Sequence, residues 1–179
     1  MWTDEVDKVL ADDWADGLPG RPIETIRSMR DEVRAVEDKV SYLRRIIQGR
    51  ADIVAADLRR RAEGGSPIDL ATLITQLPGI LSDKGGGTAG PGRLPSGVMA
   101  PDDATLTVEI DRVAGPDTLG HLATLSDDEV AELARAIGDL ERRTSAIRRG
   151  LFGRIDALNG ELARRYGSGE ADVAALLDR

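Results

Sequence analysis

Five side chains recur on two stretches of this chain with the same spacing. They are Glu37, Ser41, Arg44, Gln48 and Asp52 in the first copy, and Glu141, Ser145, Arg148, Phe152 and Asp156 in the second. Each residue of the second copy lies 104 positions after its counterpart. Steps of three and four residues match a helix, so one copy spans an arc of roughly 80° and a length of about 21–23 Å. The pattern E-x3-S-x2-R-x3-(Q/F)-x3-D therefore predicts two polar stripes on two helices.

The residue types of each stripe suit a guanine nucleotide. A carboxylate accepts hydrogen bonds from N1 and the amino group of guanine, and arginine donates to O6 and N7 or lies over the base. Ser and Gln add further donors and acceptors. Because there are two matching stripes, a ligand with two-fold symmetry is favoured, such as a cyclic dinucleotide with two guanines. We therefore expect all ten positions to bind such a ligand, as one molecule or two.

The same stripes have a plainer interpretation. Exposed faces of long helices commonly carry Glu, Arg, Gln and Asp, whose i,i+4 pairs support the helix. Under that hypothesis the protein is a structural or adaptor coiled coil without a small-molecule ligand. The repetition in matching register on two separate helices favours ligand binding over this alternative.

Enzymatic function is the third hypothesis, a phosphate-handling enzyme on a helical scaffold. The sequence has no P-loop, no Cys nucleophile and no metal-ligand cluster near His121, its single histidine. We therefore predict neither a catalytic residue nor a metal ligand.

Composition narrows the class of protein. Only 3% of the 179 residues are aromatic. This composition favours helices that pack along rows of aliphatic side chains over a large globular core. The absence of cysteine favours a reducing compartment. A net charge of −8 argues against nucleic acid and for a protein partner with a basic surface. No apolar run approaches the ~20 residues that span a bilayer, and the acidic start does not resemble a signal peptide, so a cytoplasmic location is expected.

Two long helices are predicted from apolar residues three and four positions apart. The first runs from Ile23 to about Ala62, where Gly64 and Gly65 end it. The second follows a capping box at Ser126–Glu129 and runs to about Tyr166. On each helix these apolar residues form a row, which we call its seam. The seam of the first helix is Ile26, Met29, Val33, Val36, Val40, Leu43, Ile47, Val54 and Leu58. The seam of the second helix is Val130, Leu133, Ile137, Leu140, Ile147, Leu151, Ile155, Leu158 and Leu162.

The fold class expected is all-α, with the two long helices packed as an antiparallel coiled-coil hairpin. The connection between them is long enough for a parallel arrangement as well. The predicted segments are a short N-terminal helix at 1–17, the long helices at 22–63 and 126–166, a short helix plus flexible Gly/Pro-rich connection at 66–125, and a short C-terminal helix at 168–179.

Three flanking segments have further predictions. The N-terminal helix, with Trp2 and Trp14, either docks a partner or packs on the long helices. The terminal helix has the same two interpretations. The alternating sequence TLTVEI at 105–110 is strand-like and predicts a segment that packs in extended form or pairs with a partner.

The doubled motif resembles that of the RsiG-type anti-sigma factors of actinobacteria. The resemblance covers both long helices and matches nine of the ten motif positions; the exception is Phe152, where Gln is expected. It implies a helical hairpin that binds cyclic di-GMP through the two motifs. It also implies that the ligand-bound protein holds a flagellar-class sigma factor of the WhiG type and blocks transcription by that sigma factor. The genes that the sigma factor controls would then be sporulation or motility genes. Because one chain carries both motifs, a monomer is expected before the partner binds, although a homodimer remains open.

Overall fold

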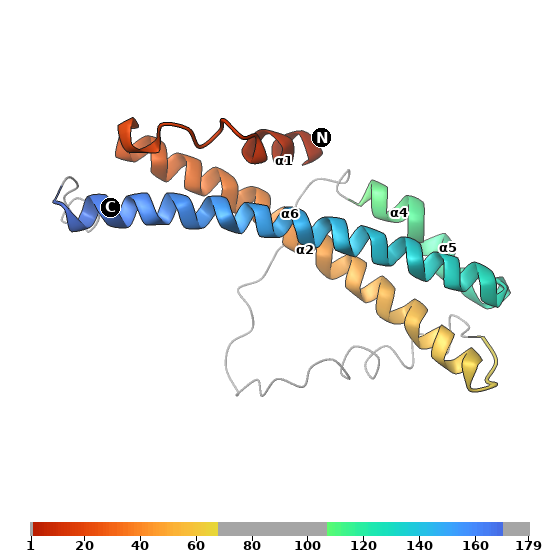
Figure 1. The fold of residues 1–179 in the computed structure, drawn as a ribbon. Helices are drawn as coiled ribbons and strands as arrows, with labels where there is room; N and C mark the ends of the chain where they lie inside the picture. Colours follow the sequence, from red (N-terminus) through yellow and green to blue (C-terminus); the bar gives the residue numbers. More distant parts are fainter. Residues whose placement is uncertain (1, 68–106, 170–179) are drawn as a thin grey trace, which may run out of the picture. The chain divides into compact units, whose positions relative to one another are not determined.

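The computed structural model describes residues 2–67 and 107–169, and all regular structure in these ranges is helical (Figure 1). Two long helices dominate it, α2 (Ile23–Ala62) and α6 (Asp127–Gly167). The chain divides into two compact units. Unit 1 comprises Met1–Ser41 and Ala146–Arg179, and unit 2 comprises Tyr42–Ser145. The all-helical class is confirmed, and the two long helices pack together in each unit.

Unit 1 is built on an apolar core shared by three helices. Helix α1 (Trp2–Leu10) and the 3-10 turn η1 (Leu18–Gly20) precede α2. The core consists of Val6, Val9, Ile26, Met29, Val33, Val36, Val40, Leu151, Ile155, Leu158 and Leu162. Trp14 and Leu18 pack against it. The N-terminal segment thus packs on the long helices of its own chain, which is one of the two interpretations left open by the sequence.

Polar contacts fix the same three helices of unit 1. Lys39 on α2 pairs with Glu5 on α1 at 2.6 Å, and Arg27 near the start of α2 donates to the Tyr166 hydroxyl near the end of α6. Arg154 on α6 donates to the carbonyl oxygens of Leu10 and Ala11. Because that guanidinium satisfies carbonyls at the end of α1, the helix closes there.

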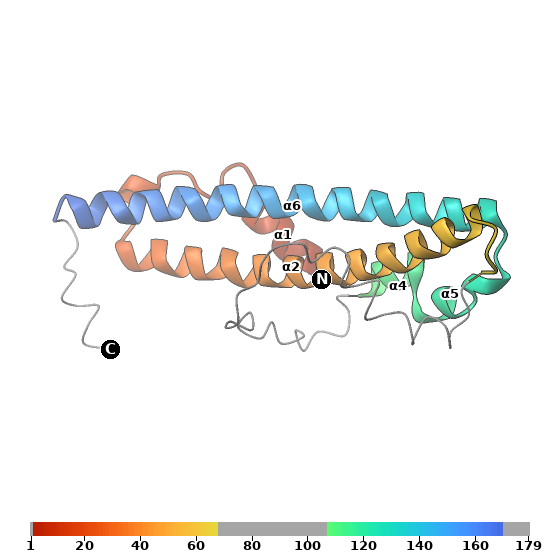
Figure 2. The ribbon, with the colours of Figure 1, turned by 90° about the horizontal axis from the view of Figure 1, so that it is seen from below.

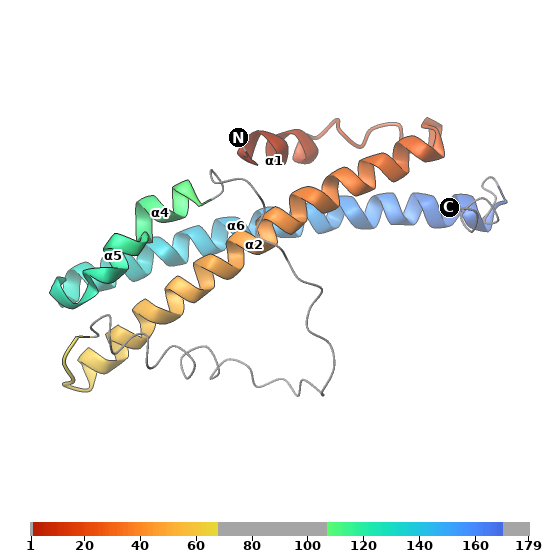
Figure 3. The ribbon, with the colours of Figure 1, turned by 180° about the vertical axis from the view of Figure 1, so that it is seen from behind.

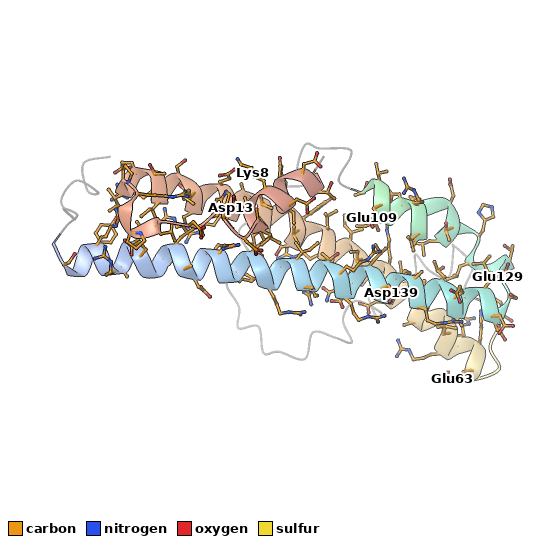
Figure 4. The ribbon with its side chains drawn as sticks, turned by 45° about the horizontal axis from the view of Figure 1, so that its top comes forward. Lys8, Asp13, Glu63, Glu109, Glu129 and Asp139 are labelled. Atoms are coloured by element: carbon orange, nitrogen blue, oxygen red, sulfur yellow. The ribbon has the colours of Figure 1, made fainter. Side chains whose placement is uncertain are left out.

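Unit 2 repeats this plan with other residues. Helix α4 (Val108–Ala114), helix α5 (Pro116–Gly120) and the 3-10 turn η2 (Leu122–Thr124) precede α6 (Figures 2 and 3). Its buried apolar residues are Leu43, Ile47, Val54, Ile110, Ala114, Leu122, Val130, Leu133, Ile137 and Leu140. Asp111 of α4 pairs with Arg50 of α2 at 2.5 Å, and Glu109 of α4, labelled in Figure 4, pairs with Arg143 of α6 at 3.5 Å.

The C-terminal part of the first seam departs from the prediction. Asp57 is fully buried, whereas Leu58 is only partly buried. The heptad that places Val54 in the seam continues to positions 57 and 61, so an acid and Arg61 occupy it. Arg61 donates to the Asp57 carboxylate at 2.7 Å and to the Leu122 and Leu125 carbonyls, which compensates the buried charge. The pKa of Arg61 is raised above its usual value, mainly by the hydrogen bond that Arg61 donates to Asp127.

The N-terminal helix is shorter than predicted. It ends at Leu10 rather than about Gly17, and Gly17 adopts a left-handed conformation with φ of 68°. Acidic residues at 12 and 13 would oppose the negative end of a longer helix.

The segment at 105–110 was predicted to be extended, and its described part is not. Thr107 is a turn and Val108–Ala114 is helical, so the described part of the connection at 66–125 contains a helix. Ile110 and Ala114, four residues apart, are both buried, and a six-residue alternation does not exclude such a helix. The pKa of Asp111 lies below its usual value, first because Thr107 donates to it and then because Arg50 does.

Both long helices begin and end close to the predicted residues. Ser126 and Glu129 form the expected capping box, since the Ser126 backbone N–H donates to Glu129 and the Glu129 N–H donates to the Ser126 hydroxyl. Glu129 is labelled in Figure 4, and the Ser126 backbone bond holds its pKa below the usual range. The short helix predicted at the start of 66–125, most of the Gly/Pro-rich connection after it and the C-terminal helix predicted at 168–179 lie almost wholly outside the described residues. No helix in the described part of the chain is long and apolar enough to cross a membrane.

Candidate nucleotide-binding clusters

Unit 1 brings three motif residues into one cluster, which we call cluster 1. Glu37 and Ser41 lie one turn apart on α2, and the Ser41 hydroxyl donates to the Glu37 carboxylate at 2.5 Å. Arg148 reaches them from α6. Its Nε lies 2.9 Å from Glu37 and 2.8 Å from the Ser41 hydroxyl oxygen. Cluster 1 therefore joins the acid and hydroxyl of the first motif to the arginine of the second.

Unit 2 holds the matching set with the helices exchanged, cluster 2. The Ser145 hydroxyl on α6 donates to Glu141 at 2.9 Å. Arg44 on α2 places its Nε 3.0 Å from the Ser145 oxygen and 3.3 Å from Glu141. The same three residue types thus make the same contacts in both units.

The remaining motif residues lie farther along the two helices. Phe152 and Asp156 follow Arg148 on α6 in unit 1, and both are exposed. Gln48 and Asp52 follow Arg44 on α2 in unit 2, and both are half-buried. The Phe152 ring faces the Arg148 guanidinium, whose central carbon lies 4.7 Å from the ring centre. Each unit therefore contains all five positions of the motif, taken from both copies.

Both clusters sit on rigid backbone. Val36, Val40 and Leu151 are buried beside cluster 1, and Leu43, Ile47 and Leu140 are buried beside cluster 2. Helices fixed by buried aliphatic residues hold polar groups more accurately than loops do. The clusters therefore have the preorganisation that a binding site needs.

The arginines keep part of their hydrogen-bonding capacity. Within residues 2–67 and 107–169, the hydrogen bonds of Arg44 and Arg148 use Nε and leave both terminal nitrogens unbonded. Their side chains are 32% and 35% exposed. Each guanidinium is thus oriented by protein and open to a ligand along the edge that suits a base or a phosphate.

Two other properties of the molecule narrow the chemistry. No group of His, Asp or Glu side chains suited to a metal ion occurs in the described residues. A groove of about 530 Å³ in unit 1 is lined by Lys8, Ala11, Asp13, Trp14, Arg21, Met29 and Glu32. None of these is a motif residue, so the clusters are not part of this groove.

The offset of 104 residues extends well beyond the motifs, into segments that the doubled motif alone does not indicate. Residues 3–10 read TDEVDKVL and residues 107–114 read TVEIDRVA, and these are the segments of α1 and α4. The turns η1 and η2 also differ by 104. Comparing the whole chain with itself at this offset would have revealed α4 as the counterpart of α1.

The contacts repeat with the sequence. Glu5 pairs with Lys39, and their counterparts Glu109 and Arg143 pair as well. Arg165 donates to the Leu18 and Pro19 carbonyls and pairs with Glu161, as its counterpart Arg61 does with η2 and Asp57. These residues hold the helix ends that frame the clusters.

Comparison with known protein families agrees with the motif. A family model described as RsiG-like matches residues 13–81 and 116–179, which is more than half of the chain. The chain belongs to the RsiG-like family. No curated protein matches the chain.

Membership in the RsiG-like family gives the protein a regulatory role, that of an anti-sigma factor, with a sigma factor as its partner. The match covers both long helices and therefore both clusters. It begins after α1, and its second part begins after α4, so these two helices lie outside the matched ranges.

Proposed function

We propose that this RsiG-like protein is a cyclic di-GMP-dependent anti-sigma factor that sequesters a flagellar-class sigma factor of the WhiG type. The observation that carries the proposal is the doubled cluster. In each unit, Arg, Ser and Glu meet between α2 and α6, with Asp and either Gln or Phe farther along. These groups complement guanine and phosphate, and two sets suit a ligand with two guanines.

In this proposal α2 and α6 form an antiparallel hairpin. The contacts that support it pair Arg27 near the start of α2 with Tyr166 near the end of α6, and Arg61 near the end of α2 with Asp127 at the start of α6. The first contact lies within unit 1 and the second lies within unit 2. The stripes of the two helices then face one another along the hairpin, and the dinucleotide binds between them.

The ligand acts by completing a surface. Arginine donates to a guanine edge or phosphate, the carboxylates accept from the guanine amino group, and the bound dinucleotide adds its own phosphates to an acidic protein. A sigma factor then contacts protein and ligand together, so its sequestration follows the concentration of the second messenger. The proposed setting is the cytoplasm of an actinobacterium, where release of the sigma factor switches on sporulation or motility genes.

Calorimetric titration of cyclic di-GMP, with and without a WhiG-type sigma factor, tests the proposal. We expect saturable binding that falls at least a hundredfold in Arg44→Ala and Arg148→Ala, since each loses a charge-assisted contact. Asp156→Asn is expected to prevent assembly with the sigma factor.

The chain supplies matched controls. Arg45 and Arg149 also lie 104 residues apart, are exposed, and sit one position beyond the motif arginines. Their alanine variants should bind as the wild type does. Equal losses in all four arginine variants would indicate a general charge effect and contradict a specific site.

The structural or adaptor coiled coil remains the second candidate. Its support is that Arg44 and Arg148 join α2 to α6 by ion pairs that need no ligand. Absence of dinucleotide binding in both mixtures, with helicity intact by circular dichroism, would favour that candidate.

A further inference from the structure

Phe152 flanks cluster 1, and it is the motif position at which the surroundings of the two clusters differ most. It is 39% exposed, and among the described residues only Val108 is another large apolar side chain with such exposure. A phenyl ring open to water normally loses favourable burial. Here one face of the ring lies against the Arg148 guanidinium, and the remaining ring surface is available to another flat group.

The counterpart of Phe152 is Gln48, which flanks cluster 2. An amide offers two donors and an acceptor to the edge of a base, whereas a phenyl ring offers none. Cluster 1 therefore has one edge-reading group fewer than cluster 2. In exchange it has an aromatic face, and stacking on such a face is tolerant of base identity because every base has a π-surface.

Arg148 reinforces this difference. Its Nε is fixed by Glu37 and Ser41, and the Phe152 ring lies beside its guanidinium. The guanidinium and the ring thus form one exposed stacking surface. Arg44 makes no cation–π contact with an aromatic ring among the described residues, so cluster 2 depends on polar contacts.

We propose that Phe152 is a specificity-determining residue that makes cluster 1 a stacking site with relaxed base choice. This inference rests on the proposed function and deepens it. Cluster 2 demands guanine through hydrogen bonds to its edge, whereas cluster 1 holds a purine mainly by its face. Cluster 1 therefore accepts adenine in place of guanine better than it would with Gln at position 152.

The test compares cyclic di-GMP with 3′,5′-cyclic GMP-AMP by calorimetry, in the presence and absence of the sigma factor. The wild type, Phe152→Gln and Phe152→Leu are measured in full-length chains. Phe152→Leu should weaken both ligands by about tenfold, because it keeps an apolar side chain and removes the stacking face. Phe152→Gln should increase the preference for cyclic di-GMP over cyclic GMP-AMP by about fivefold to tenfold.

Two further variants separate stacking from a structural role. Gln48→Phe should reduce the preference for cyclic di-GMP, since it gives cluster 2 the same aromatic face. Phe152→Trp should restore tight binding and show quenching of indole fluorescence on ligand addition, beyond the change seen in the wild type.

Each outcome decides the inference. An unchanged preference in Phe152→Gln, or full affinity in Phe152→Leu, would overturn it while leaving the proposed function intact. If the wild type binds neither dinucleotide in either mixture, both the proposed function and the role of Phe152 are refuted.

Discussion

Clusters 1 and 2 contain the same arginine, serine and glutamate arrangement in different surroundings. Glu37 in cluster 1 is 13% exposed, whereas its counterpart Glu141 in cluster 2 is 31% exposed. Arg148 stacks on Phe152, whereas Arg44 is followed by Gln48. The polar triad has thus been kept while its flank has diverged. Under the proposed function, this difference separates the groups that bind the ligand in both units from those that adjust its selectivity.

The arginine–carboxylate pairs at the helix ends also differ between the two units. Arg61 pairs with the fully buried Asp57 and donates to two carbonyls of the η2 region, and Arg165 pairs with Glu161 and donates to two carbonyls of η1. Glu161 also pairs with Arg164. The acid in unit 1 therefore has a second arginine near it, and the two ends should respond differently to mutation.

The largest expected effect is the loss of Arg61. Arg61→Ala should lower the free energy of unfolding by about 3–5 kcal/mol, because it removes the guanidinium from a buried carboxylate. Arg165→Ala should cost less, since Arg164 still neutralises Glu161. Urea unfolding followed by circular dichroism measures both, with Arg45→Ala as an exposed control. Equal losses at the two ends would show that the second arginine in unit 1 contributes nothing.

The pH dependence of stability gives an intermediate effect. Hydrogen bonds from Arg164 and then Arg165 lower the pKa of Glu161 to about 2. Because this value lies below that of the unfolded chain, the ionised carboxylate stabilises the fold above about pH 4.5, and the contribution is lost as the pH falls towards 2. Glu161→Gln should therefore be less stable than the wild type at pH 7, and the difference should shrink within this window.

Unfolding curves of both proteins between pH 7 and pH 2.5 measure that difference. Glu132→Gln, on a residue whose side chain is 70% exposed, should show little difference from the wild type at any pH. A gap between Glu161→Gln and the wild type that stays constant down to pH 2.5 would contradict the role of the ionised carboxylate.

The smallest expected effect concerns two ion pairs on the surface, one between α1 and α2 and one between α4 and α6. Glu5–Lys39 and Glu109–Arg143 are partly exposed, so double-mutant cycles should give about 0.5 kcal/mol or less for each, and less still in high salt. The pair at 2.6 Å should contribute more than the pair at 3.5 Å. A large coupling energy in unit 2 alone would reverse the order expected from these distances.

Much of the fold was predictable from the sequence because it depends on periodicity. The apolar seams predicted α2 and α6, and the capping box at Ser126 predicted where α6 begins. Short helices were harder to predict. The sequence of α4 has a two-residue alternation, which is typical of a strand. Its helical form depends on tertiary contacts, namely the burial of Ile110 and Ala114 and the pairing of its Asp111 with Arg50. The burial of Asp57 was equally hidden, because it requires Arg61 and carbonyls more than sixty residues away.

The candidate site was predicted in its residues and only partly in its arrangement. Spacing placed five side chains on one face of each helix. Two facts required the structure: Glu and Ser of one copy meet Arg of the other, and Phe152 lies against Arg148. Such contacts depend on the facing helix, which no local pattern specifies. The roles of these ten residues in ligand binding remain predictions.

Unit 1 packs α2 residues against α6 residues that lie more than 100 positions later in the chain, so the two are synthesised at different times. Its α2 residues leave the ribosome roughly 100 residues before the α6 residues that cover them, a delay of about 5–20 s at ordinary rates of translation. During that time Ile26, Val33 and Val40 have no native cover from α6. Unit 2 is continuous in sequence and can close earlier. The nascent chain thus exposes an apolar helix face that chaperones or premature partners can bind until the second half of α6 has emerged.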